Sequence, residues 1–266
     1  MSVAASVRRA GNHPALEWVI RAGFAGYGLT HLAIAWLALS IAFGHAAGSG
    51  DQSGAFELLR RQPGGPVILA VVVVGLVAMA LWQLLVAMAV HRAEPGSDRP
   101  SQRLASIGRV IVYGFLAWTA GKVAWGTPTS SDAQQRTATA GILGHTAGQW
   151  LVALAGLAVL GLGIGLIGYG VKRAFRDKLG GMTRRTRDTM YALGTTGYVA
   201  KGVAFGIVGV LLVVAARNDR AQSSGLDAAL HTLTRQPFGG LLLTLVAIGF
   251  AAFGVYCFGQ AKYRKV

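Results

Sequence analysis

Three stretches of this chain contain no charged residue, and their length limits the possible folds more than any other feature. They are residues 66–90, 150–171 and 238–259. Each reaches the roughly 20 apolar residues that a helix needs to cross a membrane, where every backbone polar group must be bonded within the helix. The whole chain is 53% hydrophobic and 13% charged, about half the roughly 25% charged residues of a soluble domain. The sequence therefore predicts an all-α polytopic membrane protein.

Three further stretches have the length and apolar character of spans. They are residues 22–44, 107–126 and 191–216, of which the last two contain Lys or Arg. Together with the uncharged stretches they give six predicted transmembrane helices.

The basic residues predict the orientation of these helices. Most of the 25 Lys and Arg residues lie in the N-terminus, the C-terminus and the connections 92–109 and 172–187. By the positive-inside rule these segments face the cytoplasm. We expect a bacterial cytoplasmic (inner) membrane protein with both termini in the cytoplasm and residues 1–20 as an uncleaved N-terminal segment. The same asymmetry explains the net charge of +15 without a nucleic-acid partner.

The chain repeats itself. Moving 174 residues along it carries Arg61-Gln62-Pro63 onto Arg235-Gln236-Pro237, and moving 86 residues carries Tyr27-Gly28 onto Tyr113-Gly114. Two spans per repeat give all copies the same orientation, so their symmetry axis runs along the membrane normal. The prediction is a pseudo-threefold six-helix bundle with repeats at 21–92, 106–176 and 190–262.

The segment GDQSGAFELLRRQPGG, residues 50–65, joins the two spans of the first repeat. Its apolar and charged residues predict a short helix in the outer membrane interface. Pro63 ends that helix, and the glycines that follow permit the turn. We expect Arg61 and Arg235 at equivalent interfacial positions on the outer side.

Two stretches resemble a known family. Residues 51–87, DQSGAFELLRRQPGGPVILAVVVVGLVAMALWQLLVA, are similar to the repeat of the bacterial membrane family called domain of unknown function 1206. Residues 197–212, GYVAKGVAFGIVGVLL, resemble the first helix of that repeat. The resemblance covers the first and third repeats well and the second loosely. It implies three tandem two-helix units in the cytoplasmic membrane and no established activity.

Lys201 lies within a predicted span, and the repeat offsets make Tyr27 and Tyr113 its equivalents. All three side chains could face the axis and form a polar layer that binds an anion or a lipid headgroup, since charges inside membranes are often functional. Alternatively, Lys201 reaches the interface or makes a structural pair.

Residues 163–168, GIGLIG, match a dinucleotide-binding pattern but lie inside an apolar span, without the strand that such a site requires. The glycines at 161, 165, 168, 202 and 206 are better explained by close helix packing. No cofactor is expected. The ten acidic residues all lie outside the spans, and no spacing predicts a metal site or a catalytic constellation.

The connection after the fourth span carries seven basic residues between 172 and 187. Such a cluster attracts anionic lipid headgroups; setting the topology and docking an acidic partner are the alternatives. The candidate lipid contacts are Lys172, Arg173, Arg176, Arg184, Arg185 and Arg187.

These features predict a protein that is not an enzyme. The first functional hypothesis is an accessory or scaffold subunit that binds other membrane proteins or lipids. The alternative is a small transporter or channel for an anion or lipid that uses the pseudo-threefold axis.

Overall fold

A computed structural model describes residues 14–44, 50–89, 99–126, 137, 140–141, 146–218, 226–234 and 236–264. The described chain is helical apart from one isolated bridge between Leu179 and Arg264. Its elements are α2 (Pro14–Ala42), α3 (Gln52–Arg60), α4 (Gly65–Ala89), α5 (Arg99–Ala124), α7 (Thr146–Val171), the 3₁₀ turn η2 (Arg176–Lys178), α8 (Arg184–Asn218), α9 (Leu226–Thr234) and α10 (Gly239–Tyr263).

The helix boundaries repeat with the predicted offset of 174 residues. It carries both ends of α3 onto those of α9, and both ends of α4 onto those of α10. The turn before the long helix repeats as well. Gly64 has φ +75° and its equivalent Phe238 has φ +61°, so both occupy the left-handed region. The first and third repeats therefore share one local fold.

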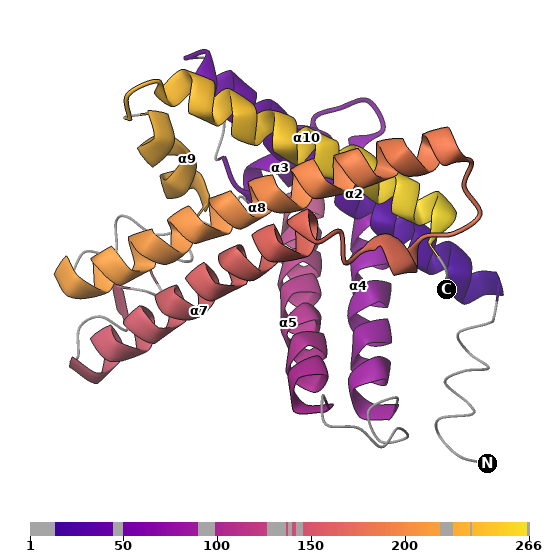
Figure 1. Cartoon of the computed structure of the whole chain (residues 1–266), viewed down its shortest axis with the longest axis horizontal. Helices are drawn as coiled ribbons and strands as arrows, with labels where there is room; N and C mark the ends of the chain where they lie inside the picture. Colours follow the sequence, from indigo (N-terminus) through magenta and orange to yellow (C-terminus); the bar gives the residue numbers. More distant parts are fainter. Residues whose placement is uncertain are drawn as a thin grey trace.

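The long helices pack in a cyclic order. The second long helix of each repeat packs most extensively on the first helix of the next: α4 on α5, α7 on α8, and α10 on α2. In Figure 1 the α4–α5 pair runs vertically, whereas the α7–α8 and α2–α10 pairs run obliquely and cross it near its upper end. This cyclic pairing treats the three repeats alike, as expected of equivalent units.

The short helices fill the junctions between repeats. Phe56 of α3 is fully buried in a cluster with residues of α4 and α5. Its equivalent in α9, Leu230, is buried to the same degree with residues of α10 and α2. Because each short helix directs its large apolar side chain between two long helices, burial against protein accounts for much of its apolar face. An interfacial position for these helices stays a prediction.

Glycines bring α7 and α8 into close contact. A Cβ on Gly163 would lie 2.6 Å from the Gly202 carbonyl oxygen and 2.7 Å from the Gly206 nitrogen, and one on Gly209 would lie 2.5 Å from the Leu160 nitrogen. Packing at 202 and 206 is thus confirmed. The glycines at 161, 165 and 168 have open space around them, so packing between the described helices of this chain does not explain them. The packed glycines 156, 163 and 170 recur every seven residues and therefore follow one face of α7.

The middle repeat departs from the other two. The paired helices α2 and α4 pack on each other, as do α8 and α10, whereas the described parts of α5 and α7 make no comparable contact. In the first repeat Gly23 meets Gly75, and a Cβ on Gly75 would lie 2.7 Å from the Gly23 Cα. The position equivalent to Gly23 in α5 is Arg109, which is exposed. A large charged side chain at that point prevents the same close approach.

The described residues contain four helices that are long and apolar enough to cross a membrane. They lie at Arg21–Ala42, Gly148–Val171, Arg184–Arg217 and Gly239–Tyr263, with a shorter apolar helix at Gly65–Leu81. The helical, repeated architecture agrees with the prediction. The total of six membrane spans stays an expectation.

Candidate functional site

Lys201 and its two repeat equivalents, Tyr27 and Tyr113, meet where the repeats cross. Lys201 Nζ on α8 donates a hydrogen bond of 2.8 Å to Tyr27 Oη on α2. The Tyr27 ring contacts that of Tyr113 on α5 edge to face, with ring centroids 6.1 Å apart. When side chains at equivalent positions touch each other, those positions surround a common centre. The structure therefore brings the three residues together; what they do there stays a prediction.

Lys201 is held inside the protein and does not extend toward an interface. It is 8% exposed, and its Nζ lies 4.2 Å from the centroid of the Phe253 ring and 4.9 Å from that of Tyr27. Among the described residues no salt bridge involves Lys201. Ring faces attract a cation with about 0.5–2 kcal/mol, so aromatic residues provide the stabilisation that a carboxylate would otherwise give.

Two residues of this cluster did not enter the sequence-based set. His31, 5% exposed, lies one turn after Tyr27, and its Nδ1 donates to the Tyr27 carbonyl oxygen at 2.8 Å, because a carbonyl can only accept. The centroid of the His31 ring lies 4.3 Å from that of the Tyr27 ring and 4.8 Å from that of the Phe253 ring. The sequence could have indicated His31, because it is the one histidine in the apolar stretch of residues 22–44. Phe253 had no such signal, since its neighbours in the sequence of α10 are apolar.

The structure adds the His31 imidazole to the predicted polar layer of Tyr27, Tyr113 and Lys201. The cluster thus holds one ammonium group, two phenols and one imidazole. An ammonium and phenol hydroxyls are hydrogen-bond donors suited to an anion. Here the Lys201 ammonium donates to a neighbouring phenol and lies against rings. The arrangement therefore joins α2, α5 and α8 through their own side chains.

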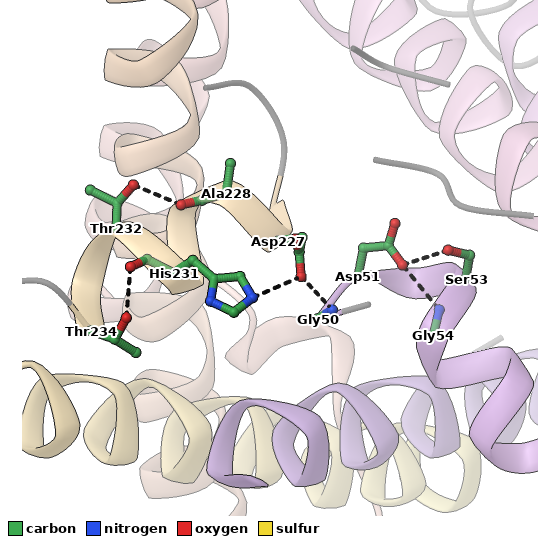
Figure 2. Close-up of polar contacts among 9 residues, drawn as sticks. All are labelled: Gly50, Asp51, Ser53, Gly54, Asp227, Ala228, His231, Thr232 and Thr234. Carbon is green, nitrogen blue, oxygen red and sulfur yellow. Dashed lines mark hydrogen bonds and ion pairs between the residues drawn. The ribbon is translucent and has the colours of Figure 1, made fainter. Parts of the chain in front are cut away.

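A second polar cluster joins the first and third repeats beside the short helices (Figure 2). Asp227 in the first turn of α9 accepts a 2.7 Å hydrogen bond from the Gly50 N–H, and His231 Nε2 lies 3.6 Å from the same carboxylate oxygen. Asp51 points the other way and caps α3 by accepting from the Gly54 N–H at 3.0 Å. Asp227 thus connects two segments far apart in the chain.

Of the two arginines predicted on the outer side, the structure describes only Arg61. Arg61 follows α3, is exposed, and donates through Nε to Glu57 at 3.1 Å. Arg235 lies outside the described residues. Within the described ranges no group of three or more possible metal ligands occurs.

The basic residues of the 172–187 connection lie on the surface. All six predicted lipid contacts are exposed, and so is Lys178, which the sequence-based set left out. Between them Phe175 and Leu179 are buried, and the Gly180 N–H donates to the Tyr263 carbonyl oxygen at 2.9 Å. The segment is therefore folded against the ends of α8 and α10, with its cations pointing outward.

The comparisons with known proteins agree with this architecture. The family model described as Domain of Unknown Function (DUF1206) matches three segments, residues 22–89, 104–175 and 196–264. The "Uncharacterized protein YxxB" of Bacillus subtilis (strain 168) is 30% identical over 258 residues, which cover 94% of this chain and 92% of that protein. No solved structure matches. Because the three matched segments coincide with the three helical repeats and cover most of the chain, this protein belongs to the DUF1206 family.

Proposed function

We propose that this protein is a non-enzymatic accessory or scaffold subunit of the bacterial cytoplasmic membrane that binds other membrane proteins or lipids. The observation that carries the proposal is the open face of α7. This helix is the least buried of the four candidate spans, and Gly161, Gly165 and Gly168 have no neighbouring atom within contact distance. Small residues let a second helix approach closely within a bilayer, so the face suits association with another membrane helix.

The positions of exposed aromatic residues support the membrane placement. Phe43 follows α2, Trp125 follows α5, Trp150 lies in the second turn of α7 and Phe238 precedes α10, and all are exposed. These helix ends are opposite to those that carry the 172–187 connection and the C-terminus. Aromatic residues gather at membrane interfaces and basic residues on the cytoplasmic side, which favours cytoplasmic termini and a span at α5 as well.

Photo-crosslinking in native membranes tests the scaffold proposal. A photoreactive residue at position 165 should form one reproducible protein adduct, and the same residue at position 74, an exposed position of α4, should not. Gly165→Leu, introduced beside a photoreactive residue at 161, should abolish the adduct. Crosslinks to lipid alone, or a protein adduct that persists in the Gly165→Leu protein, would contradict the proposal.

Transport along the repeat axis is the second candidate, favoured by the buried ammonium of Lys201 at the meeting of the repeats. The expected result is anion or lipid flux in proteoliposomes that Lys201→Met abolishes. Flux that survives this substitution would remove the lysine from the mechanism.

A further inference from the structure

The segment from 172 to 187, which we call the basic loop, presents an unbalanced positive surface. Seven Lys and Arg residues in it are exposed, and the nearby acids are Asp177 and Asp188. Asp188 lies 3.9 Å from Arg187, and the other cations of the loop make no salt bridge with a described residue. Most of this charge is therefore available to an external anion.

Aromatic residues fix the loop in place. Phe175 is fully buried, and its ring fills the space beside Gly194 of α8, where a Cβ would lie 2.6 Å from the Phe175 ring. The ring stacks on Tyr198 with centroids 5.5 Å apart and meets Tyr256 of α10 at 5.2 Å. Since the loop is anchored at its centre, its cations are already positioned before any ligand binds, which lowers the entropy cost of binding.

Two cations stand over tyrosine rings near the helix ends. Lys178 Nζ lies 5.4 Å from the centroid of Tyr169, on α7, and Arg176 Cζ lies 5.8 Å from that of Tyr191, on α8. Tyrosine is typical of the headgroup level of a membrane. With the membrane placement proposed above, these rings would lie at the headgroup level, and the two cations over them would lie at the depth of the lipid phosphates.

Arg173 has a backbone conformation that does not suit an arginine. Its φ is +52°, and it is the second residue after the end of α7. The Arg173 N–H donates to the Gly170 carbonyl oxygen at 3.0 Å, and the Ala174 N–H to that of Tyr169 at 3.1 Å. Glycine is the usual residue at this left-handed position of a helix end. The fold would thus be served at least as well by glycine, and the exposed arginine calls for another reason.

We infer that the basic loop binds the headgroup phosphates of anionic phospholipids, with Arg173, Arg176 and Lys178 as direct contacts. The inference rests on the membrane placement and lipid-binding role proposed above and names the lipid class. A lipid is favoured over an acidic protein because the loop connects α7 to α8 and contacts the end of α10, three of the four candidate spans. Anionic headgroups thus lie beside it in the membrane.

Lipid titration of the full-length protein in mild detergent tests this inference. Short-chain phosphatidylglycerol should raise the thermal unfolding temperature, and phosphatidylcholine should not, because binding to the folded state alone stabilises it. Arg173→Gly should unfold at an equal or higher temperature without lipid, yet bind phosphatidylglycerol about fivefold more weakly. The triple variant Arg173→Gly, Arg176→Gln, Lys178→Gln should bind roughly 100-fold more weakly.

The matched control is Arg60→Gln with Arg61→Gln, which removes one half-buried and one exposed cation at the other end of the helices and should leave the lipid response unchanged. An unchanged response in the triple variant, an equal response to phosphatidylcholine, or a loss of stability in the Arg173→Gly protein would overturn the inference. A response to inorganic phosphate or to an acidic peptide in place of the lipid would also overturn it and assign the surface to that ligand. The membrane placement itself is tested separately by surface labelling, so the two failures are distinguishable.

Discussion

At the scale of single residues, the pair formed by Lys201 and Tyr27 is the most informative contact. The two residues are 174 positions apart and bond at 2.8 Å, so a residue contacts its own repeat equivalent. The sequence could predict this meeting because the offset and the type of residue were both visible. It could not predict that Phe253 supplies the face for the ammonium, because nothing distinguishes this phenylalanine from its apolar neighbours.

A double-mutant cycle measures the energy of this pair. Tyr27→Phe removes the acceptor of a buried ammonium and should lower the free energy of unfolding by about 1–3 kcal/mol. Lys201→Met keeps the aliphatic stem and removes the charge, so its effect should be near neutral or stabilising. The double variant should be more stable than the sum of the single effects by at least ~0.5 kcal/mol. Thermal unfolding in mild detergent gives the readout.

Tyr113→Phe is the matched control for that cycle. Tyr113 contacts Tyr27 through its ring, which phenylalanine preserves, so the variant should unfold close to the wild-type temperature. Strictly additive effects of Tyr27→Phe and Lys201→Met would show that the hydrogen bond contributes nothing to stability.

At the scale of elements, the two faces of α7 have different roles that the sequence did not separate. Glycines occur on both faces, and from composition alone all of them were predicted to pack against a neighbouring helix. The face that meets α8 became visible only with the partner helix in place. In the same way the amphipathic pattern of 52–60 predicted a short helix correctly, while the partner of its apolar side, the α4–α5 junction, depended on tertiary packing.

Leucine substitutions distinguish the two faces of α7. Gly163→Leu should lower the free energy of unfolding by about 1–3 kcal/mol or more, since overpacking a tight interface forces the backbones apart. Gly165→Leu should leave unfolding almost unchanged, because its surroundings are open. A Gly165→Leu protein as unstable as the Gly163→Leu protein would mean that the face is occupied within the monomer.

Alanine substitutions test the role of the short helices. Phe56→Ala should cost about 3–5 kcal/mol and Leu230→Ala about 2–5 kcal/mol, because each leaves a cavity between two long helices. Val71→Ala on α4, a half-exposed position, serves as the control with a small expected effect. If the two short helices lay mainly in the membrane interface, Phe56→Ala and Leu230→Ala would weaken stability no more than this control does.

At the scale of the whole molecule, cyclic pairing of the helices follows from the repeats. Self-similarity identified equivalent positions, and the boundaries of α3, α4, α9 and α10 confirm the offset to the residue. The sequence did not reveal which helices pair, because equivalence does not specify neighbours. Nor did it predict that the described parts of α5 and α7 lack the packing seen within the other two repeats, although Arg109 at the position equivalent to Gly23 indicated that the middle repeat differs there.

Surface labelling of introduced cysteines tests the repeated membrane architecture most directly. The natural Cys257 is fully buried and is replaced by alanine, and single cysteines are placed at 61, 235 and 178. In intact cells a membrane-impermeant maleimide should label Arg61→Cys and Arg235→Cys, and should label Lys178→Cys only after the membrane is opened. Labelling of positions 61 and 235 from opposite sides of the membrane would contradict the three-repeat account.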